Sequence, residues 1–500
     1  MRTRSLRPGV LVAVVAILFT ACSGSATPVP SAAASATPAE STAAPASSAP
    51  AFSPTPEPAG PPVTIKWFCC LGGGDDPSTL KVFDTLIKEF NASQKHIVLQ
   101  LDHVAYEGAR DAFATRLASG NPPDIVGPLG VGGTNAFAGQ WLDLTQYIAS
   151  NNIDLSGFDQ GVIDLNKAGG SAQYGLPFAI YPSELYFQPD MFDEVKLNPP
   201  PPTYGTQYQM PDGSMVDWNY DTLRQIAMKL TLDKNNKSAD DPAFDPKHIV
   251  QYGFEPQRDD LRTMGAAFFS KGKLLSDDGK TVQIPDAWAA AWKWVYNGMW
   301  TDHFIMTGPT FQGQAFNGGG YAFNSGKVAM QENYLWDVCC VTDAGGNWDL
   351  AALPAYNGTV TAPINADTFR ITKGTKHPDE AFTALSYLVL GAGKTRLLNS
   401  ISAFPALKAD QPSFFAQLEQ QKNDKGKLIY PPSVNWQVVT DAIPFADIDP
   451  NSENAMPNYN KSLDTLAKYL TRWTSTPGLD MDAEFAKLKT ELQAVWDSAP

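Results

Sequence analysis

The segment 64–126 alternates between strand-forming and helix-forming sequence, and this alternation restricts the fold of the chain more than any other feature. Its parts are, in order, a β-rich run at 64–68, a helical apolar pattern at 80–90, an alternating run at 96–104, a helical stretch at 107–118 and a strand-like run at 120–126. Strands joined by helices pair in parallel, and ligands of such sheets collect at the carboxyl ends of the strands. The sequence therefore predicts an α/β fold with a parallel sheet, and a ligand is expected at the loops that begin at Cys69 and Gly127.

The remainder of the chain continues this mixed pattern without a second linker. Four further helices are expected at 287–299, 378–390, 461–473 and 482–496, where apolar residues recur at helical spacing. Residues 63–500 are numerous enough for two well-packed lobes. Because no low-complexity segment interrupts them, we expect the lobes to be interwoven rather than joined in series.

The N-terminus has the composition of an export signal. Three arginines within the first seven residues precede an apolar run at 10–19, which is shorter than the ~20 residues of a membrane-spanning helix. Thr20 and Ala21 then precede Cys22, an arrangement that resembles the bacterial lipoprotein signal. We predict that 1–22 is a lipoprotein signal peptide and that Cys22 is lipidated; the alternative is an ordinary secretory peptide with an incidental cysteine. Residues 23–62 are nearly all Ala, Pro, Ser and Thr, which predicts a disordered tether.

The charge balance excludes one class of partner. The chain has 52 acidic and 37 basic side chains and a formal net charge of -15, whereas nucleic-acid binding requires a basic field. Aromatic residues make up 11% of the chain, which suits uncharged ligands that stack on rings. We therefore expect no nucleic acid partner.

Several short segments carry a more specific signal, because they occur together and in a fixed order. They are Ser119–Ile125, Gly175–Phe178 with Leu185–Phe187, Phe323–Met330 followed by Trp336, Leu353-Pro354 with Arg370-Ile371 and His377–Ala381, and Phe404–Ala406. In these segments the chain resembles the extracellular solute-binding proteins of ABC sugar importers, the family of maltose-binding protein. The resemblance implies a two-lobed, type II periplasmic-binding-protein-like fold with a hinge and an interlobe ligand. We place lobe one at 63–180 plus 361–405 and lobe two at 181–360 plus 406–500.

The resemblance also implies which residues hold the ligand. Trp336 matches the stacking tryptophan of the family, although a core role is the alternative because most aromatic residues are buried. The other candidates come from loops expected to enter the same crevice, and Glu255 and Gln257 are weaker ones. The full set of predicted ligand-binding residues is Asp75, Gly130, Tyr181, Glu332, Asn333, Trp336, Asp337, Asn365 and Asp367.

The four cysteines of the predicted folded part form two adjacent pairs, Cys69-Cys70 and Cys339-Cys340. An exported protein meets an oxidising environment, in which disulfides form. Four cysteines can be joined into two disulfides in three ways. Neighbouring Cα atoms lie ~3.8 Å apart in a trans peptide, below the usual 4.4–6.8 Å of a disulfide. We hypothesise two vicinal disulfides that line the cleft; free thiols and cross-links between the pairs are the alternatives.

A calcium loop is a further hypothesis. Asp233, Asn235 and Asp241 place oxygen donors at alternating positions, as calcium loops do, but Lys237 stands at a ligand position and the loop glycine and final Glu are missing. A hydrated acidic loop is the alternative. No other cofactor is expected.

The predicted function is binding of a ligand without catalysis of a reaction. The motifs G-x-S-x-G, H-E-x-x-H and C-x-x-C are absent from the sequence. We expect a monomeric, non-enzymatic protein anchored by lipid outside the cytoplasmic membrane, which binds a carbohydrate and delivers it to ABC permease subunits. The main alternative is a secreted carbohydrate-active enzyme, a lyase or glycosidase; an adhesive lipoprotein would explain the tether but not the ordered segments.

Overall fold

The computed structural model describes most of the chain beyond the predicted tether. The described residues are 60–167, 171–258, 260–318, 322–339, 341, 347–391, 393–423, 425–447 and 456–498, without the side chains of Val131 and Cys339. The predicted signal peptide, Cys22 and nearly all of the tether lie outside them, so these predictions stay untested. None of the helices within the described residues is long and apolar enough to span a membrane.

A six-stranded mixed sheet forms the first lobe. It consists, in spatial order, of β16 (Phe404–Pro405), β4 (Leu176–Tyr181), β15 (Asn365–Ile371), β3 (Ile125–Leu129), β1 (Val63–Cys69) and β2 (Ile97–His103). The predicted parallel pairing is correct for β1 with β2 and β3. It is wrong for the other half, because β15 is antiparallel to β3 and β4. β15 returns to the sheet from the second lobe, and its direction is therefore not set by a local strand–helix–strand connection.

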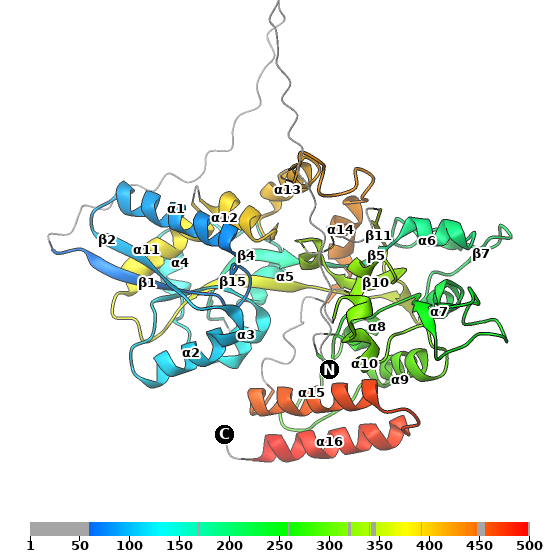
Figure 1. The fold of residues 1–500 in the computed structure, drawn as a ribbon. Helices are drawn as coiled ribbons and strands as arrows, with labels where there is room; N and C mark the ends of the chain where they lie inside the picture. Colours follow the sequence, from blue (N-terminus) through cyan, green and yellow to red (C-terminus); the bar gives the residue numbers. More distant parts are fainter. Residues whose placement is uncertain are drawn as a thin grey trace, which may run out of the picture. The chain divides into compact units, whose positions relative to one another are not determined.

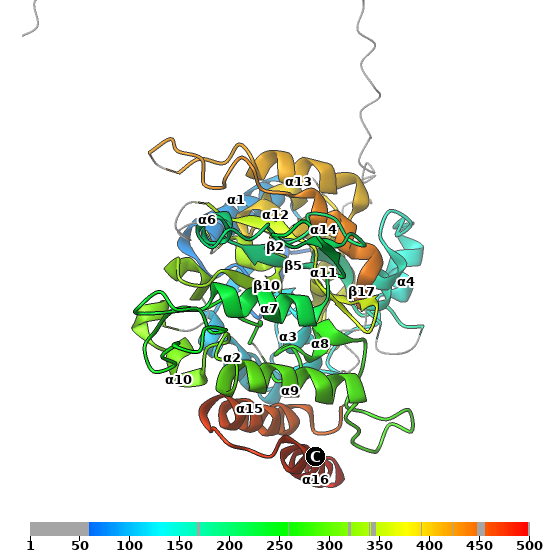
Figure 2. The same cartoon turned by 90° about the vertical axis from the view of Figure 1, so that its right-hand side faces the viewer.

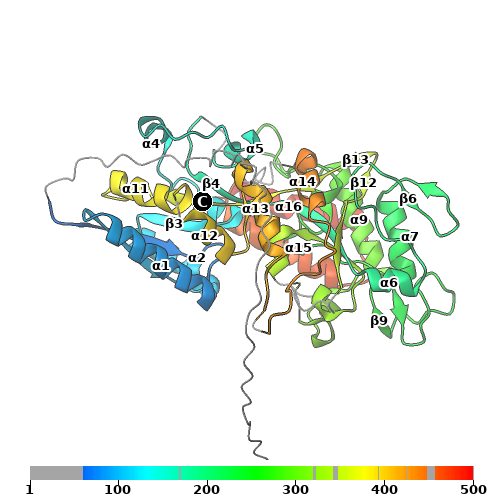
Figure 3. The same cartoon turned by 90° about the horizontal axis from the view of Figure 1, so that it is seen from above.

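Alternation along β1 gives the sheet two apolar faces. Trp67 packs against Phe83 of α1 (Pro77–Ser93), with ring centroids 4.7 Å apart, whereas Phe68 packs against Phe113 of α2 (Tyr106–Ala118) at 5.4 Å. The first face is also covered by α11 (Pro378–Val389) and α12 (Lys394–Ser400), which lie beside α1 (Figures 1 and 3). The start of α1 is fixed by Asp76, whose side chain accepts from the amides of Ser78 at 2.9 Å and Thr79 at 3.0 Å.

The second lobe is built on a three-stranded antiparallel sheet of β10 (Met330–Tyr334), β5 (Ser183–Phe187) and β11 (Asp349–Ala351). Its core is rich in tryptophan. Trp292 of α9 (Asp286–Trp300) lies 5.4 Å from Trp473 of α15 (Tyr459–Ser475), and both rings contact α16 (Met481–Asp497) through Phe485. Figure 2 shows α9, α15 and α16 stacked in this order. The four helices predicted at 287–299, 378–390, 461–473 and 482–496 are thereby confirmed as α9, α11, α15 and α16.

The chain crosses between the two sheets where strands follow each other directly. β4 ends at Tyr181 and β5 begins at Ser183, while β14 (Ala362–Pro363) is followed by β15. The Ser183 hydroxyl donates to the Pro363 carbonyl at 2.7 Å, which ties the two crossings together. These crossings lie close to the predicted divisions at 180/181 and 360/361; the exact lobe boundaries stay a prediction.

The remaining elements are short. The helices are α3 (Val131–Ala136), α4 (Thr145–Ser150), α5 (Gln160–Asp164), α6 (Pro189–Glu194), α7 (Tyr220–Leu230), α8 (Ala266–Phe269), α10 (Gly308–Phe311), α13 (Gln411–Leu418) and α14 (Gln437–Ala442). The strands are β6 (Tyr208–Gln209), β7 (Met215–Val216), β8 (Leu232–Asp233), β9 (Ile249–Gln251), β12 (Ala355–Tyr356), β13 (Thr359–Val360) and β17 (Ala446–Asp447).

Candidate functional site

The carboxyl ends of β1 and β3 open onto a cavity of about 1030 Å³ that both lobes line. The first lobe contributes the loops that follow β1 and β3 and the start of β15. The second lobe contributes residues from the segments 256–258 and 260–263, one face of β10, the short helix η3 (Leu335–Cys339) and α15. The cavity thus occupies the position at which ligands of parallel sheets collect.

Every predicted ligand-binding residue except Glu332 lines this cavity. They are Asp75, Gly130, Tyr181, Asn333, Trp336, Asp337, Asn365 and Asp367. The structure therefore brings together residues that are separated by almost 300 positions in the sequence.

Glu332 faces the opposite side of β10, and its predicted place in the cavity is wrong. Successive strand residues point to opposite faces, so Gln331 and Asn333 turn to the cavity and Glu332 turns away. Its carboxylate accepts from the Tyr220 hydroxyl at 3.2 Å in the core of the second lobe. Burial raises the pKa of Glu332 well above its ordinary value.

Three aromatic rings meet at the junction of the lobes. Trp336 lies edge-on to Tyr181, with centroids 5.6 Å apart, and packs against Tyr334 at 4.3 Å. Tyr181 ends β4 and Trp336 lies in η3, so the contact joins the first crossing to the segment that follows β10 in the second lobe. The Trp336 ring is half-buried and lines the cavity, which leaves apolar surface for a ligand to cover.

Asp367 is the most deeply buried carboxylate of the first-lobe wall. It is 7% exposed and accepts from the Tyr181 hydroxyl at 3.1 Å and from the backbone of Gly73. Burial raises the pKa of Asp367 to about 6, although both hydrogen bonds oppose the shift. Among the described residues, no basic side chain forms an ion pair with it, so a polar ligand would find a carboxylate free of a countercharge.

The glycine loop after β1 approaches the loop after β3 very closely. A Cβ atom at Gly72 would lie 3.0 Å from the Pro128 carbonyl oxygen and 3.2 Å from the amide nitrogen of Gly130. Gly74 has φ +108°, and a Cβ there would meet the Phe83 ring at 2.8 Å. These glycines therefore allow backbone to form this part of the cavity wall.

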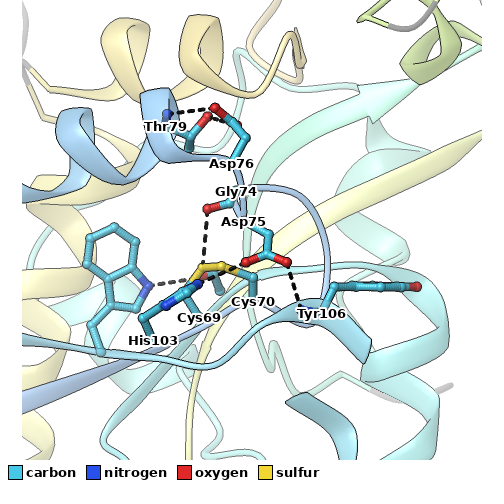
Figure 4. The surroundings of a disulfide bond; sticks show 10 residues. Cys69, Cys70, Gly74, Asp75, Asp76, Thr79, His103 and Tyr106 are labelled. Carbon is cyan, nitrogen blue, oxygen red and sulfur yellow. Dashed lines mark hydrogen bonds and ion pairs between the residues drawn. A yellow bond between two sulfur atoms is a disulfide. The ribbon is translucent and has the colours of Figure 1, made fainter. Parts of the chain in front are cut away.

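Asp75 anchors the end of the same loop (Figure 4). Its carboxylate accepts from the Tyr106 amide at 3.0 Å and lies 2.9 Å from His103 Nε2. The hydrogen bond from Tyr106, followed by that from His103, lowers the pKa of Asp75 below its ordinary value. Asp75 is therefore both a loop anchor and a charged part of the cavity wall.

A disulfide joins Cys69 to Cys70 at the end of β1, which confirms the vicinal pairing there (Figure 4). Both sulfur-bearing side chains are fully buried and are not among the residues that line the cavity, so the predicted lining role of Cys69 and Cys70 is wrong. The disulfide lies beneath the glycine loop instead. Cys340 and the side chain of Cys339 lie outside the described residues, and their pairing stays a prediction.

The predicted calcium residues are engaged with backbone. The carboxylate of Asp233 accepts from the amides of Asn235, Lys237 and Asp245 at 2.7–2.9 Å, and Asp241 contacts Lys237 at 3.0 Å. Within the described residues there is no group of three or more His, Cys, Asp or Glu side chains that could hold a metal ion. Calcium binding stays an untested prediction.

The second-lobe wall contains residues that the sequence did not point to. Arg258 forms an ion pair with Glu255, donates to the Met306 carbonyl and lies 4.8 Å over the Phe311 ring. Gln331 lines the cavity beside it. On α15, the side chains of Tyr459, Leu463 and Leu466 also line it, because positions spaced by four and three share one helix face. The amphipathic pattern of α15 predicts a buried face but does not indicate which surface it meets.

Comparisons with known proteins agree with this geometry. A family model described as bacterial extracellular solute-binding protein matches residues 85–423. The uncharacterized lipoprotein in the oleD 5′ region of Streptomyces antibioticus is 20% identical over 355 residues, which cover 68% of this chain and 70% of that protein.

Two solved structures illustrate the shared fold. The ABC substrate-binding protein Lmo0181 from Listeria monocytogenes, in complex with cycloalternan, has a TM-score of 0.61 and 17% identity over 86% of this chain and 98% of its own. The sugar-binding protein MalE from Xanthomonas citri has a TM-score of 0.62 and 16% identity over 87% and 97%. The family match covers well over half of the sequence, and the two-lobed α/β architecture is the same. The chain belongs to the bacterial extracellular solute-binding proteins.

Proposed function

We propose that this protein is the substrate-binding component of an ABC importer, which captures a sugar or oligosaccharide in the cavity and delivers it to a membrane permease. The observation that carries the proposal is the composition of the cavity wall. A half-buried tryptophan, a tyrosine and a deeply buried carboxylate converge there from both lobes. The names of the structural relatives, one in complex with cycloalternan and one a sugar-binding protein, support the same class of ligand.

The wall offers what a sugar requires. A sugar ring has an apolar face of C–H groups, which Trp336 can cover, and hydroxyl groups that both donate and accept. Asp367 accepts hydrogen bonds, and the amides of Asn333 and Asn365 can donate and accept. The cavity volume of about 1030 Å³ slightly exceeds the ~300–1,000 Å³ usual for small-molecule sites, which favours an oligosaccharide over a single hexose.

Transport follows from the connections between the lobes, at which the lobes can move relative to each other. A ligand that contacts both walls binds the closed arrangement better than the open one, and this differential affinity shifts the equilibrium toward closure. The closed form would then dock on the permease, while a separate subunit hydrolyses ATP. We place the protein outside the cytoplasmic membrane, as the family description implies, and propose that the lipidated Cys22 anchors it as a monomer.

A thermal-shift screen of the purified protein against mono- and oligosaccharides tests the proposal. A true ligand stabilises the folded state by an amount that grows with its concentration, about 2.7 kcal/mol at 100 times Kd. Chromatography of each ligand after incubation provides the control for an enzyme. Failure of every sugar to stabilise the protein contradicts the proposal, and consumption of a bound sugar favours the enzyme instead.

A further inference from the structure

Three buried polar side chains on the second-lobe side of the cavity each retain one polar atom that has no hydrogen-bond partner among the described residues. They are Glu255, which is 1% exposed, Gln331, which is 6% exposed, and Arg258, whose side chain is 6% exposed. The atoms are Glu255 Oε2, Gln331 Oε1 and Arg258 Nη1. Buried polar atoms are nearly always paired, so this cluster points to a partner that the protein does not supply itself.

The cluster is fixed in position beside the cavity. Glu255 and Gln331 are bridge partners, so their side chains lie on the same face as neighbours. The guanidinium of Arg258 is held by Glu255 through Nε, by the Met306 carbonyl through Nη2 and by the Phe311 ring. Arg258 and Gln331 both line the cavity. Of the three atoms, the donor Arg258 Nη1 and the acceptor Gln331 Oε1 belong to residues that line the cavity and remain for a ligand, whereas Glu255 is not among the lining residues.

The charge around this site is unfavourable to anions. Glu255 balances the positive charge of Arg258 directly. Arg262, the other basic residue of the wall, lies 3.9 Å from Asp260. Asp75, Asp337 and Asp367 add further carboxylates, and His103 lies beside Asp75. A ligand carboxylate or phosphate would thus meet a compensated arginine and several carboxylates.

We infer that the Glu255–Arg258 pair determines specificity: Arg258 Nη1 donates to an oxygen of an uncharged sugar, Gln331 accepts from a neighbouring hydroxyl, and Glu255 prevents Arg258 from binding acidic sugars. The cleft therefore takes neutral sugars and rejects uronic acids and sugar phosphates. This inference rests on the proposed function, because it specifies the ligand of the same cavity.

The variant Glu255→Gln tests this inference, because it keeps the shape of the side chain and removes its charge. The probes are a neutral oligosaccharide that stabilises the wild-type protein and the uronic acid oligomer of the same length and linkage, such as galactotriose and trigalacturonate. Their affinities are measured by isothermal titration calorimetry. The wild-type protein should prefer the neutral probe by tenfold or more, and Glu255→Gln should lower this preference about tenfold by leaving Arg258 uncompensated.

Glu332→Gln is the matched control, since it changes a buried carboxyl on the opposite face of the same sheet; its preference should equal that of the wild type. Arg258→Gln should weaken binding of the neutral probe without creating affinity for the uronate. Binding of the neutral probe by each variant shows that it is folded.

Two results overturn the inference and leave the proposed function intact: a wild-type protein that binds the uronate as tightly as the neutral probe, or a Glu255→Gln protein whose preference matches that of Glu332→Gln. A wild-type protein that binds no sugar of either kind contradicts the proposed function itself, and the inference fails with it.

Discussion

The two walls of the cavity are built in different ways. The first-lobe wall contains glycine loops at the ends of parallel strands, which leave backbone exposed to the cavity, with Asp367 as its buried carboxylate. The second-lobe wall consists of side chains, with an arginine held by an ion pair, an amide and an apolar helix face. A backbone wall fixes shape and offers hydrogen bonds to many ligands, whereas a wall of positioned charges distinguishes between them. We therefore expect changes in the first wall to alter affinity and stability, and changes in the second wall to alter selectivity.

The aromatic junction between the walls should show the largest effect. Trp336→Ala removes the surface on which a sugar ring would stack and should weaken binding by about 100-fold, the size of a ~2–3 kcal/mol hot-spot residue. Calorimetry with the stabilising sugar measures the change. Trp300→Phe is a control, because this partly buried ring packs against the second-lobe core, where its indole donates to the Trp473 carbonyl. A Trp336→Ala protein with wild-type affinity would show that the junction does not bind the ligand.

The buried carboxylate of Asp367 should lower the stability of the folded protein at high pH although it contributes to sugar binding. Because burial raises the pKa of Asp367 to about 6, the proton on this group stabilises the folded state at low pH, and that stabilisation is lost as the pH rises through 6. Asp367→Asn, which cannot ionise, should therefore be more stable than the wild type by about 2 kcal/mol at pH 8. The difference should vanish near pH 4, and sugar affinity should fall. Denaturant titrations across this pH range test the prediction, and a variant that is less stable at pH 8 would contradict it.

The glycine loop should respond to a single methyl group. Gly72→Ala places a Cβ against backbone atoms of Pro128 and Gly130, which cannot move aside, and should destabilise the protein by about 1–2 kcal/mol and lower sugar affinity. Gly132→Ala in the same wall is the matched control, because a Cβ there has no atom within 4 Å among those described. Equal melting temperatures for the two variants would show that the close approach of the loops is not needed.

The smallest expected effect is a pH dependence of ligand selectivity, which should arise from the Glu255–Arg258 pair in the second wall. Burial raises the pKa of Glu255 to about 7 even though Arg258 lowers it. As the pH falls from 8 to 6.5, Glu255 gains a proton and its countercharge is lost, so discrimination against uronates should weaken a few-fold. The affinity ratio of neutral probe to uronate measures this change. A Glu255→Gln protein with the same pH dependence would assign it to another group.

The sequence predicted the first wall much better than the second. The order strand–helix–strand pointed to the loops that begin at Cys69 and Gly127, which contain Asp75 and Gly130, and the family resemblance then singled out Asp75 within its loop. Trp336 and Tyr181 came from the family resemblance. The prediction for Glu332 was wrong, because the pairing of β10 with β5 decides which face of β10 turns to the cavity. The periodicity of five residues does not show this pairing.

The part of the second wall around Arg258 and the face of α15 could not be predicted, because these parts meet only through tertiary packing; Asn333, Trp336 and Asp337 of the same wall were predicted. Arg258 lies in a polar run that resembles an exposed loop, and its burial results from Glu255 and Phe311. The antiparallel direction of β15 and the contact of α15 with the cavity have the same origin. They depend on segments far apart in sequence, for which a single chain provides no local signal.

The central claim is that both walls bind one sugar and close on it, and small-angle X-ray scattering of the protein with and without the stabilising oligosaccharide tests it most directly. We predict that the radius of gyration decreases when the sugar saturates the protein and that Trp336→Ala requires a higher sugar concentration for the same decrease. A sugar that binds fully in calorimetry but leaves the radius of gyration unchanged would contradict capture between the two lobes.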